Sequence, residues 1–387
     1  MGNYYDWQYI QEPRSREKPS HSPAAFIFLL TTLLLTSLGL VMLYSASYNE
    51  ALSFGLEHTY FFSRQLTFAL LALAPIAVVL LLPTRWIRSL SSLFLLGTVA
   101  LLLLTLFTSF GQTKLGSRRW LEIGSLPSIQ PSEFAKIATA LYFGAYFSKR
   151  QQQESQIGTF VVPSLVTLVI TALILAGRDY SSALLFLAQC CLTLVAAGLK
   201  LRYLILLFAF ITPLATVAMF SQAYRIKRIV SFLVPTLDPS GINYQVSVSL
   251  RAIRRGGLFG VGLGNGVYKQ GLLPEVHSDF IFASICEEVG FVGVALIILL
   301  FVLFIHLGYE GARRHWQEDR FISLTAFGLT TMIGLQAVMN LGVVTALLPP
   351  TGIPLPFFSQ GGTSLMVVLV SCAFIGRCLL AKREVPR

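Results

Sequence analysis

The sequence predicts an all-α protein that crosses a membrane about ten times. Of its 387 residues, 55% are hydrophobic and only 12% are charged, whereas soluble proteins carry about 25% charged residues. Apolar runs of roughly 20 residues, the length that spans a bilayer as a helix, follow one another along the chain. No polar region between these runs is long enough for a typical domain, so we expect a single membrane domain.

The first apolar segment, 24–46, is predicted to be a retained signal anchor, because it is too long for a signal peptide and further spans follow. The other predicted spans are 62–82, 88–108, 132–148, 160–177, 181–198, 203–221, 280–305, 321–345 and 363–381. The membrane domain then covers 24–381, between polar tails at 1–23 and 382–387. Its longest connection is an outer loop, 222–279, between the seventh and eighth helices.

Lysines and arginines at the ends of the spans predict the orientation, because basic residues are retained on the cytoplasmic side. Two alternate loops, near 47–59 and 346–362, contain no Lys or Arg and are predicted to be extracytoplasmic. Both termini are therefore predicted to be cytoplasmic. The net charge of +11 follows from this topology and does not indicate a nucleic-acid partner.

Two predicted outer loops carry basic residues against this trend. They are 109–131, which includes Arg118 and Arg119, and the long loop 222–279. Cations on the outer side suggest an anionic partner, most simply a phosphate group. For the long loop, an equally good explanation is that long loops cross the membrane regardless of charge. The short connection at Asp179 is predicted to be a structural turn, in which the preceding arginine could neutralise the aspartate.

The segment 274–282 places an acid, an imidazole, a hydroxyl and a second acid directly before an apolar run. A carboxylate at the mouth of a membrane helix is costly, so Asp279 suggests a functional site. The alternative is an interfacial acid that is favoured by the positive end of the helix dipole. Glu287 and Glu288 would lie roughly 12 Å deeper at helical rise, too far to share a proton with Asp279.

A second charged segment precedes and opens the predicted span 132–148. Ser132 fits a helix N-cap, which would put Glu133 in the first turn, where its charge is favoured. Glu133 and Lys136 are three residues apart and share a helix face. They could form a self-satisfied ion pair or bind a ligand, and the spacing does not decide between these. Trp120, directly after two arginines, could be an interfacial aromatic or a platform for a phosphosugar.

Two further segments are irregular. The four prolines of 348–364 exclude a regular helix. Irregular backbone at membrane depth needs protein or a wet cavity around it, so we predict a re-entrant loop that lines a cavity. The glycine-rich segment 256–266 lacks the βαβ unit of a dinucleotide site. It could form a backbone anion nest or a flexible surface turn.

The sequence contains no catalytic triad order, Walker loop, paired-cysteine motif or histidine-rich box, and no metal site is predicted. The five cysteines all lie in apolar stretches and suit buried, small apolar side chains. Any chemistry would therefore depend on carboxylates and cations around an outward-facing cavity.

The motifs GSRRW…QPSEFAK, LPEVHSDFIFASICEEVG and NLGVVTALLPPTGIPLPFFSQGGTSL resemble the SEDS family of bacterial cell-wall proteins, and the resemblance runs from about residue 25 to about 380. It implies a ten-helix peptidoglycan glycosyltransferase of the cytoplasmic membrane. Such enzymes polymerise lipid II on the outer face, beside a class B penicillin-binding protein that crosslinks the strand. The stretch YQVSVSLRAIRRGGLFGVGLGNG is more similar to division-type than to elongation-type members. That similarity implies a septal location and other division-complex membrane proteins as partners.

The resemblance also implies the site residues. The family's key aspartate falls on Asp279, the predicted catalytic base, with His277 as its nearest rival. The implied substrate-binding residues are Arg119, Trp120, Glu133, Lys136, His277, Ser359, Gly361 and Gly362. Mg or Mn could accompany the pyrophosphate, although no certain cofactor follows and no protein cage for a metal can be identified. The chain departs from the family pattern at Arg178, Ser278 and Gln360, where proline, threonine and tyrosine are usual.

Two other functions share these features. A lipid II flippase would use the same substrate but would need charged groups along the whole depth of the membrane. Here the acids and cations of the motifs lie mostly in outer loops and at outer helix ends, which favours chemistry at that face. A division scaffold without activity would not require Asp279. An elongation-type polymerase is the remaining alternative within the family.

Overall fold

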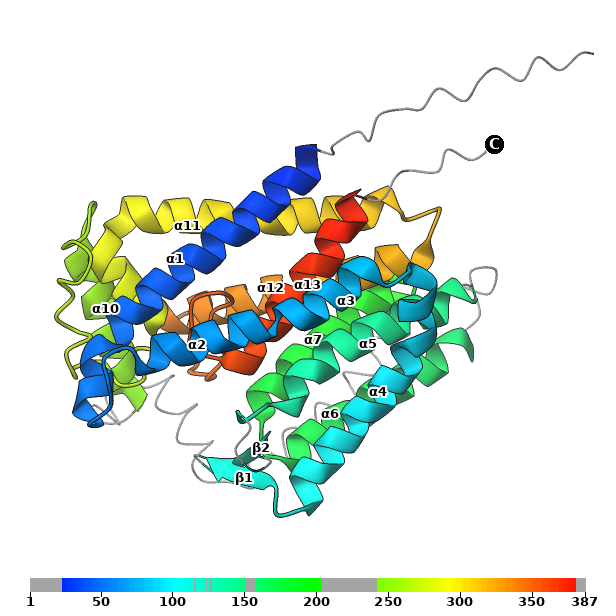
Figure 1. Ribbon diagram of the computed structural model, residues 1–387, viewed down its shortest axis with the longest axis horizontal. Coiled ribbons are helices and arrows are strands. Elements are labelled where there is room, and N and C mark those ends of the chain that lie inside the picture. The colour runs from blue at the N-terminus through cyan, green and yellow to red at the C-terminus, as the bar shows by residue number, and fades with distance from the viewer. Residues whose placement is uncertain are drawn as a thin grey trace, which may run out of the picture.

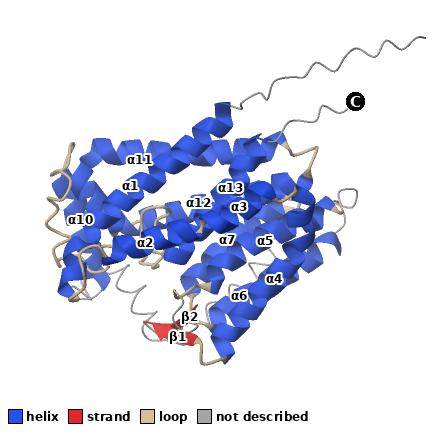
Figure 2. Ribbon diagram, viewed as in Figure 1, coloured by secondary structure: helices blue, strands red, loops and turns tan. Residues whose placement is uncertain are grey.

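The computed structural model of the protein describes residues 23–114, 116–122, 124, 127–150, 158–203 and 242–380. Within these residues the fold is a bundle of helices with one small hairpin, as predicted for an all-α membrane protein (Figures 1 and 2). The helices are α1 (Pro23–Ser53), α2 (Tyr60–Leu71), α3 (Leu73–Leu81), α4 (Thr84–Phe107), α5 (Pro131–Ser148), α6 (Gly158–Ala176), α7 (Tyr180–Ala196), α10 (Ile242–Gly256), α11 (Ile281–Arg314), α12 (Arg320–Val344) and α13 (Gly362–Leu380).

Every predicted span except 203–221 coincides with a helix, and α2 and α3 together form the second one. In the described part of the chain, seven helices are long and apolar enough to cross a membrane, and α7 is a shorter apolar helix. Span 203–221, the two tails and the first part of the long loop lie outside the described residues. The number of ten spans therefore stays a prediction.

Three features of the described chain differ from the expectation. The loop after α4 contains an antiparallel hairpin of β1 (Gly111–Lys114) and β2 (Ser117–Leu121). The sequence did not indicate this hairpin, because strands this short leave no periodic pattern to detect. The long loop 222–279 contains the amphipathic helix α10. Helix α11 extends nine residues beyond the expected end at 305, to Arg314.

Helix α11 is divided at Gly290, where the backbone is non-helical (φ 66°, ψ −173°). A Cβ atom at this position would lie 2.2 Å from the backbone nitrogen of Gly260, so only glycine fits the close approach. The N–H groups of Phe291 and Val292 donate to the carbonyls of Gly257 and Leu258, at 2.9 and 3.0 Å. The glycine-rich segment thus replaces helical hydrogen bonds lost at the break.

The centre of the bundle is formed by α12 and α13. In the most apolar stretch of each of these helices 78% of the residues are buried, compared with 17% in the stretch formed by α2 and α3. Figure 1 shows α5 and α7 beside them, α1 and α11 along one side, and α4 and α6 along the other. Between α12 and α13 the chain contains no regular helix, as the prolines predicted. The five cysteines are buried and free, also as predicted.

Candidate functional site

A cavity of about 300 Å³ lies among α2, the hairpin, α5, the loop before α11 and the proline-rich loop before α13. Of the residues that the sequence suggested, every one except Ser359 lines it. These are Arg119, Trp120, Glu133, Lys136, His277, Asp279, Gly361 and Gly362. They come from four separate stretches of the chain, which the fold brings around one polar space.

Asp279 is half-buried and lies two residues before α11. Its Oδ1 accepts a hydrogen bond from Ser278 Oγ at 2.9 Å, and Asn340 Nδ2 donates to its backbone carbonyl at 2.9 Å. A Cβ atom at Gly352 would lie 3.3 Å from Asp279 Oδ2. Gly352 also has a positive φ of 74°, which favours glycine. The carboxylate is therefore held at the cavity wall, with the proline-rich loop close against it.

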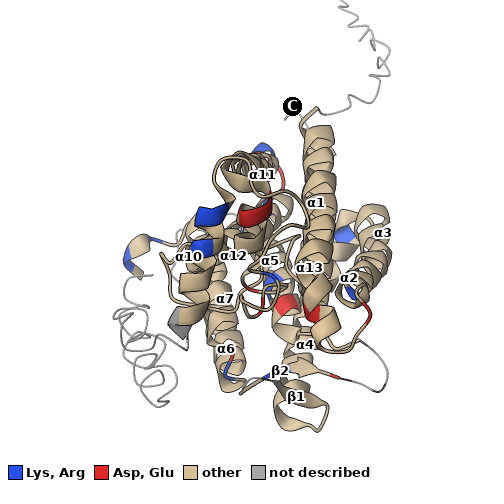
Figure 3. Cartoon of the chain, turned by 90° about the vertical axis from the view of Figure 1, so that its left-hand side faces the viewer, with Lys and Arg blue, Asp and Glu red and all other residues tan. Residues whose placement is uncertain are grey.

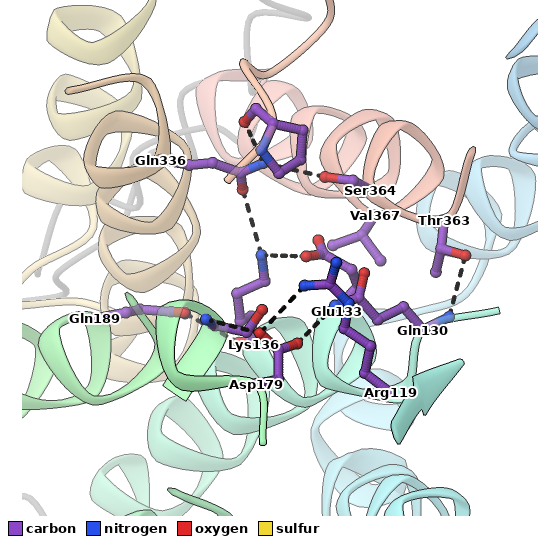
Figure 4. Close-up of polar contacts among 12 residues, drawn as sticks. Arg119, Gln130, Glu133, Lys136, Asp179, Gln189, Gln336, Thr363, Ser364 and Val367 are labelled. Atoms are coloured by element: carbon purple, nitrogen blue, oxygen red, sulfur yellow. Dashed lines mark hydrogen bonds and ion pairs between the residues drawn. The ribbon is translucent and has the colours of Figure 1, made fainter. Parts of the chain in front are cut away.

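Glu133 and Lys136 form an ion pair, which was one of the two alternatives that their spacing left open. Lys136 Nζ lies 2.7 Å from Glu133 Oε1 and also donates to Gln336 Oε1 at 3.3 Å (Figure 4). The Lys136 side chain is 1% exposed, yet both residues line the cavity. Glu133 Oε2 is buried without a hydrogen-bond partner. An acceptor without a partner, on a residue that lines a cavity, is a candidate position for a donor group of a ligand.

The start of α5 differs from the expectation for Ser132. The helix begins at Pro131, with Gln130 as its N-cap, because proline is favoured at the first helical position. Ser132 is consequently inside the first turn, and its Oγ is buried without a partner. Glu133 still lies in the first turn, as predicted.

Arg119 pairs with Asp179, with 3.5 Å between Nη1 and Oδ1 (Figure 4). Asp179 also accepts from Gln130 Nε2 at 3.0 Å and caps α7 through the N–H of Ser182 at 3.3 Å. The aspartate is therefore structural, as expected. Its cationic partner is Arg119, however, and not the adjacent Arg178, whose side chain is exposed.

Arg64 lines the same cavity and was missed by the sequence analysis. Its Nη2 donates to Ser128 Oγ at 3.0 Å, and no carboxylate of the described chain forms an ion pair with it. The signal was present, because Arg64 stands at the end of a span that the sequence predicts to be extracytoplasmic, against the tendency of basic residues to remain inside.

The proline-rich loop forms one wall of the cavity, to which Gly352, Ile353, Pro354, Gln360 and Gly361 contribute. Helix α12 holds this loop in place. Gln336 Nε2 donates to the carbonyl of Pro354 at 3.0 Å, and Asn340 Nδ2 donates to that of Ile353 at 2.8 Å.

Ser359 lies behind this wall, 4% exposed, and does not line the cavity. Its Oγ donates to the carbonyl of Ser278 at 2.6 Å and accepts from the N–H of Leu355 at 2.8 Å. Gln65 on α2 donates to the Ser359 carbonyl at 3.1 Å and accepts from the N–H of Gly361 at 3.1 Å. Both side chains thus connect the loop to its surroundings, and the sequence pattern gave no indication of Gln65.

Glu275 lines the cavity near His277 and Asp279. Although much of the residue is exposed, partial burial of its carboxyl raises the pKa of Glu275. The negative charges of Asp279 and Glu50 add to the rise in this pKa, and His277 opposes it. These four titratable groups are therefore close enough to influence one another.

Glu287 and Glu288 lie outside the cavity, and their side chains are fully buried. Glu287 pairs with Arg255 and accepts from the N–H groups of Val267 and Tyr268. Glu288 pairs with Lys269 at 2.5 Å and accepts from Ser45 Oγ and from the N–H of Gly264. We call Glu287, Glu288 and the groups that bind their carboxylates the glutamate nest. Figure 3 shows basic residues of α10 beside an acidic segment of α11. Arg255 and Lys269 therefore bind carboxylates of the same chain, whereas the sequence had suggested an external anion.

No group of three or more His, Cys, Asp or Glu side chains suited to a metal ion occurs in the described residues. In the cavity, Glu133 is already paired with Lys136, and the other charged residues that line it include Arg64 and Arg119. This donor set does not fit a protein cage for Mg or Mn. We therefore derive no step through a metal.

Sequence comparison connects this geometry to known proteins. The sequence model of the family described as "Cell cycle protein", covering FtsW, RodA and SpoVE, matches residues 25–384. The chain is 38% identical over 347 residues to "Probable peptidoglycan glycosyltransferase FtsW" of Geobacter sp. (strain M18), covering 89% of this chain and 94% of that protein. It is 36% identical over 352 residues to "Stage V sporulation protein E" of Bacillus subtilis (strain 168), covering 90% and 95%.

Solved structures agree. One described as "Structural coordination of polymerization and crosslinking by a peptidoglycan synthase complex" superposes with a TM-score of 0.72 at 26% identity, covering 91% of this chain and 96% of that one. The crystal structure of the rod shape determining protein RodA of Thermus thermophilus gives a TM-score of 0.64 at 25% identity, covering 91% and 94%. Fold and sequence thus define an integral membrane protein. The chain belongs to the FtsW, RodA and SpoVE family, which confirms the resemblance found in the sequence.

Proposed function

We propose that this protein is a peptidoglycan glycosyltransferase that polymerises lipid II at the outer face of the cytoplasmic membrane. The observation that carries the proposal is that Asp279 and the cations Arg64, Arg119 and Lys136 line one cavity. A carboxylate can take a proton from a sugar hydroxyl, and cations can hold a pyrophosphate. The printed names of the FtsW relatives support the same activity.

In the proposed reaction, the 4-hydroxyl oxygen of the acceptor sugar attacks the anomeric carbon of the lipid-linked donor. A new C–O bond forms, the bond from the anomeric carbon to pyrophosphate breaks, and undecaprenyl pyrophosphate leaves with the electron pair. Asp279 takes the hydroxyl proton as general base, which is typically worth about 10²–10⁴-fold in rate. Ser278 Oγ and the Asn340 contact to the Asp279 backbone hold the carboxylate in position for this step.

The cations have different proposed roles. Arg64 is free of carboxylate partners in the described chain, so its planar guanidinium is available for two phosphate oxygens. Arg119 is shared with Asp179 at 3.5 Å and can keep that contact while another of its N–H groups binds phosphate. Lys136 is fixed by Glu133 and Gln336, and we assign it a constant positive charge on the cavity wall.

The distribution of buried charge favours a polymerase over a flippase. Among the described residues, the buried Lys, Arg, Asp and Glu side chains lie in outer loops or near helix ends. They are Glu133, Lys136, Asp179, Lys269, Glu287, Glu288 and Arg320. The buried polar side chains midway along α5, α7 and α12 are uncharged, as with Thr139, Gln189 and Thr330. A path for a pyrophosphate across the whole bundle would need cations at that depth.

We further propose a septal location, cytoplasmic termini, and partnership with a class B penicillin-binding protein and other division-complex membrane proteins. The FtsW names of several relatives support the division role. The similar structure concerned with coordinated polymerisation and crosslinking supports a transpeptidase partner. Co-purification with a division transpeptidase is expected, whereas selective binding of an elongation transpeptidase would assign an elongation role.

The decisive experiment uses purified full-length protein with lipid II in detergent, where no second compartment exists and a flippase can make no product. Wild-type protein should give glycan polymer on a gel. Asp279→Asn keeps shape while removing basicity, so it should lower the rate by about 10²–10⁴-fold without a change in thermal stability. Glu57→Gln, which changes an exposed outer acid away from the cavity, is the matched control. Near-normal polymer from Asp279→Asn would exclude Asp279 as the base.

A further inference from the structure

The imidazole of His277 is held from three sides. Its Nδ1 lies 2.5 Å from Oε2 of Glu50, near the end of α1. Its ring packs on Phe61 of α2, with 4.4 Å between ring centroids and 34° between ring planes. The N–H of Gln360, from the proline-rich loop, donates to the His277 carbonyl at 2.9 Å. Three elements distant in sequence therefore fix the position of one ring.

The contact with Glu50 determines which ring nitrogen carries the proton. A carboxylate accepts hydrogen bonds, so Nδ1 is the donor, and in the neutral ring Nε2 keeps its lone pair. No hydrogen bond to Nε2 is formed within the described chain. His277 lines the cavity that contains Asp279, so Nε2 is the nitrogen that remains for chemistry there. A base positioned by a third group has the geometry of an activated catalytic dyad.

The surroundings of the ring are acidic. From the same loop, Glu275 and Asp279 line the cavity with it, and α1 contributes Glu50. Helix α2 faces the ring with Phe61, which is uncharged, and carries Arg64 on the cavity wall. The proline-rich loop contacts it through Gln360, also uncharged. The charged groups around the ring are therefore three carboxylates and one guanidinium.

We propose that Glu50 and His277 form a carboxylate–imidazole dyad that removes the proton from Asp279 after each glycosyl transfer. The inference rests on the proposed function and deepens it. The hydroxyl proton of the acceptor moves to a carboxylate oxygen of Asp279, then to Nε2 of His277, and finally to water. The electron pair of the broken O–H bond stays on the acceptor oxygen, which bonds to the anomeric carbon, so no further reactant is needed. His277 is a catalytic residue in this scheme, and Glu50 is a positioning residue.

The need for such a dyad follows from repeated chain extension. Asp279 accepts one proton per added disaccharide and must become a carboxylate again before the next one. It is half-buried, so water has restricted access to it. The alternative is that Glu50 only fastens α1 to the outer loop, in which case any hydrogen-bonding side chain at position 50 would serve.

The test measures kcat and KM for lipid II polymerisation by full-length protein. Glu50→Gln should lower kcat by about 10–100-fold with little change in KM, the range found when the hydrogen-bond partner of a metal-bound histidine is removed. Glu50→Asp should recover part of the loss. His277→Gln should lose a similar factor, and the double variant Glu50→Gln/His277→Gln should lose no more than His277→Gln alone, because Glu50 acts through the ring.

Chemical rescue separates proton transfer from packing. Added imidazole should restore part of the activity of His277→Ala and none of that of Asp279→Asn, with Glu57→Gln as the unaffected control. Thermal unfolding of each variant reports the loss of packing separately. The dyad is overturned if Glu50→Gln has the wild-type kcat, or if imidazole fails to rescue folded His277→Ala. Absence of polymer from wild-type protein would instead contradict the proposed function itself.

Discussion

Two clusters of buried charge lie near the same end of this protein, and they differ in how completely their groups are satisfied. In the glutamate nest, all four carboxylate oxygens of Glu287 and Glu288 accept hydrogen bonds or ion pairs. In the cavity, Glu133 Oε2 and Arg119 Nε are buried without a partner. The nest is closed on itself, whereas the cavity walls keep hydrogen-bonding capacity for a ligand.

The difference teaches that buried charge in a membrane bundle does not by itself identify a functional site. Both clusters contain paired acids and bases at helix ends, and both suggested function in the sequence. A site also needs space and unsatisfied groups, and Glu133 and Arg119, which both line the cavity, each carry a polar atom without a hydrogen-bond partner in the described chain. In the nest, the chain itself supplies the cations and the backbone donors. Substitutions in the nest should therefore affect folding, and those in the cavity should affect catalysis.

A large effect on stability is expected at the nest. Glu288→Gln leaves Lys269, whose side chain is 4% exposed, without its anionic partner. Breaking a buried pair in this way costs about 3–5 kcal/mol. Urea or thermal unfolding in one detergent measures the loss. Glu310→Gln breaks the more exposed pair with Arg314 and serves as control, with an expected cost of about 0–1 kcal/mol.

Replacing both partners, as in Lys269→Met/Glu288→Gln, should recover much of the stability, because no unpaired charge is left. The folded fraction of each nest variant should retain the wild-type polymerisation rate per molecule. A stable Glu288→Gln protein that has lost activity would show that the nest belongs to the site.

An intermediate case is the pair of Glu133 and Lys136, which is buried like the nest but lines the cavity. Lys136→Met or Glu133→Gln alone should cost about 3–5 kcal/mol, since each leaves one uncompensated charge. The double variant should be more stable than either single one and yet inactive, if the pair also binds substrate. Unfolding curves and the lipid II gel assay measure the two effects separately. A fully active double variant would give this pair a structural role only.

The comparison of the two clusters also shows what the sequence could predict. Long apolar runs predicted the spans, and the spacing of Glu133 and Lys136 predicted that they share a helix face, because these depend on local helical geometry. The resemblance indicated eight of the residues that line the cavity. It could not show that Arg255 and Lys269 form ion pairs with the two glutamates of the nest, since these contacts depend on how the long loop folds back.

The other positions that the sequence did not predict also depend on contacts between distant segments. Arg64 and Glu50 stand outside the recognised motifs, and only packing of α1 and α2 against the outer loop brings them to the site. Ser359 belongs to a recognised motif, but the turn of the proline-rich loop directs it to the Ser278 carbonyl, behind the wall. Local pattern thus predicted elements and pairs within one helix, whereas contacts between distant segments needed the three-dimensional structure.

A smaller effect is expected for Arg64→Ala, which tests whether an unpaired cation in the cavity binds pyrophosphate. Loss of a charge-assisted hydrogen bond costs about 1.5–3 kcal/mol, equivalent to roughly 10–150-fold weaker lipid II binding. Arg64→Lys should recover only part of this affinity, because ammonium lacks the planar fork of guanidinium. Direct binding of labelled lipid II to detergent-solubilised protein provides the measurement. Arg85→Ala, at the start of α4 and outside the cavity, is the control, and equal affinity for all three variants would remove Arg64 from the site.

The smallest effect concerns Glu275, whose carboxyl belongs to the cavity but makes no ion pair within the described chain. Because burial, and then the nearby carboxylates, raise the pKa of Glu275 above its ordinary value of 4.5, its ionisation in the folded protein disfavours folding. This penalty is absent well below pH 4.5 and is complete above the raised pKa. Glu275→Gln should therefore be slightly more stable than wild type at pH 8, and this advantage should disappear as the pH falls toward 4.

Melting temperatures of wild type and Glu275→Gln across this pH range check the sign, with Glu57→Gln as an exposed acid outside the cluster. The expected gain is small because much of Glu275 is exposed and solvent screens its charge. The opposite sign, with Glu275→Gln less stable at pH 8 than at pH 4 relative to wild type, would mean that Glu275 is ionised and paired. Glu275 would then resemble the acids of the glutamate nest, and the contrast between a closed nest and an incompletely satisfied cavity would no longer hold at this position.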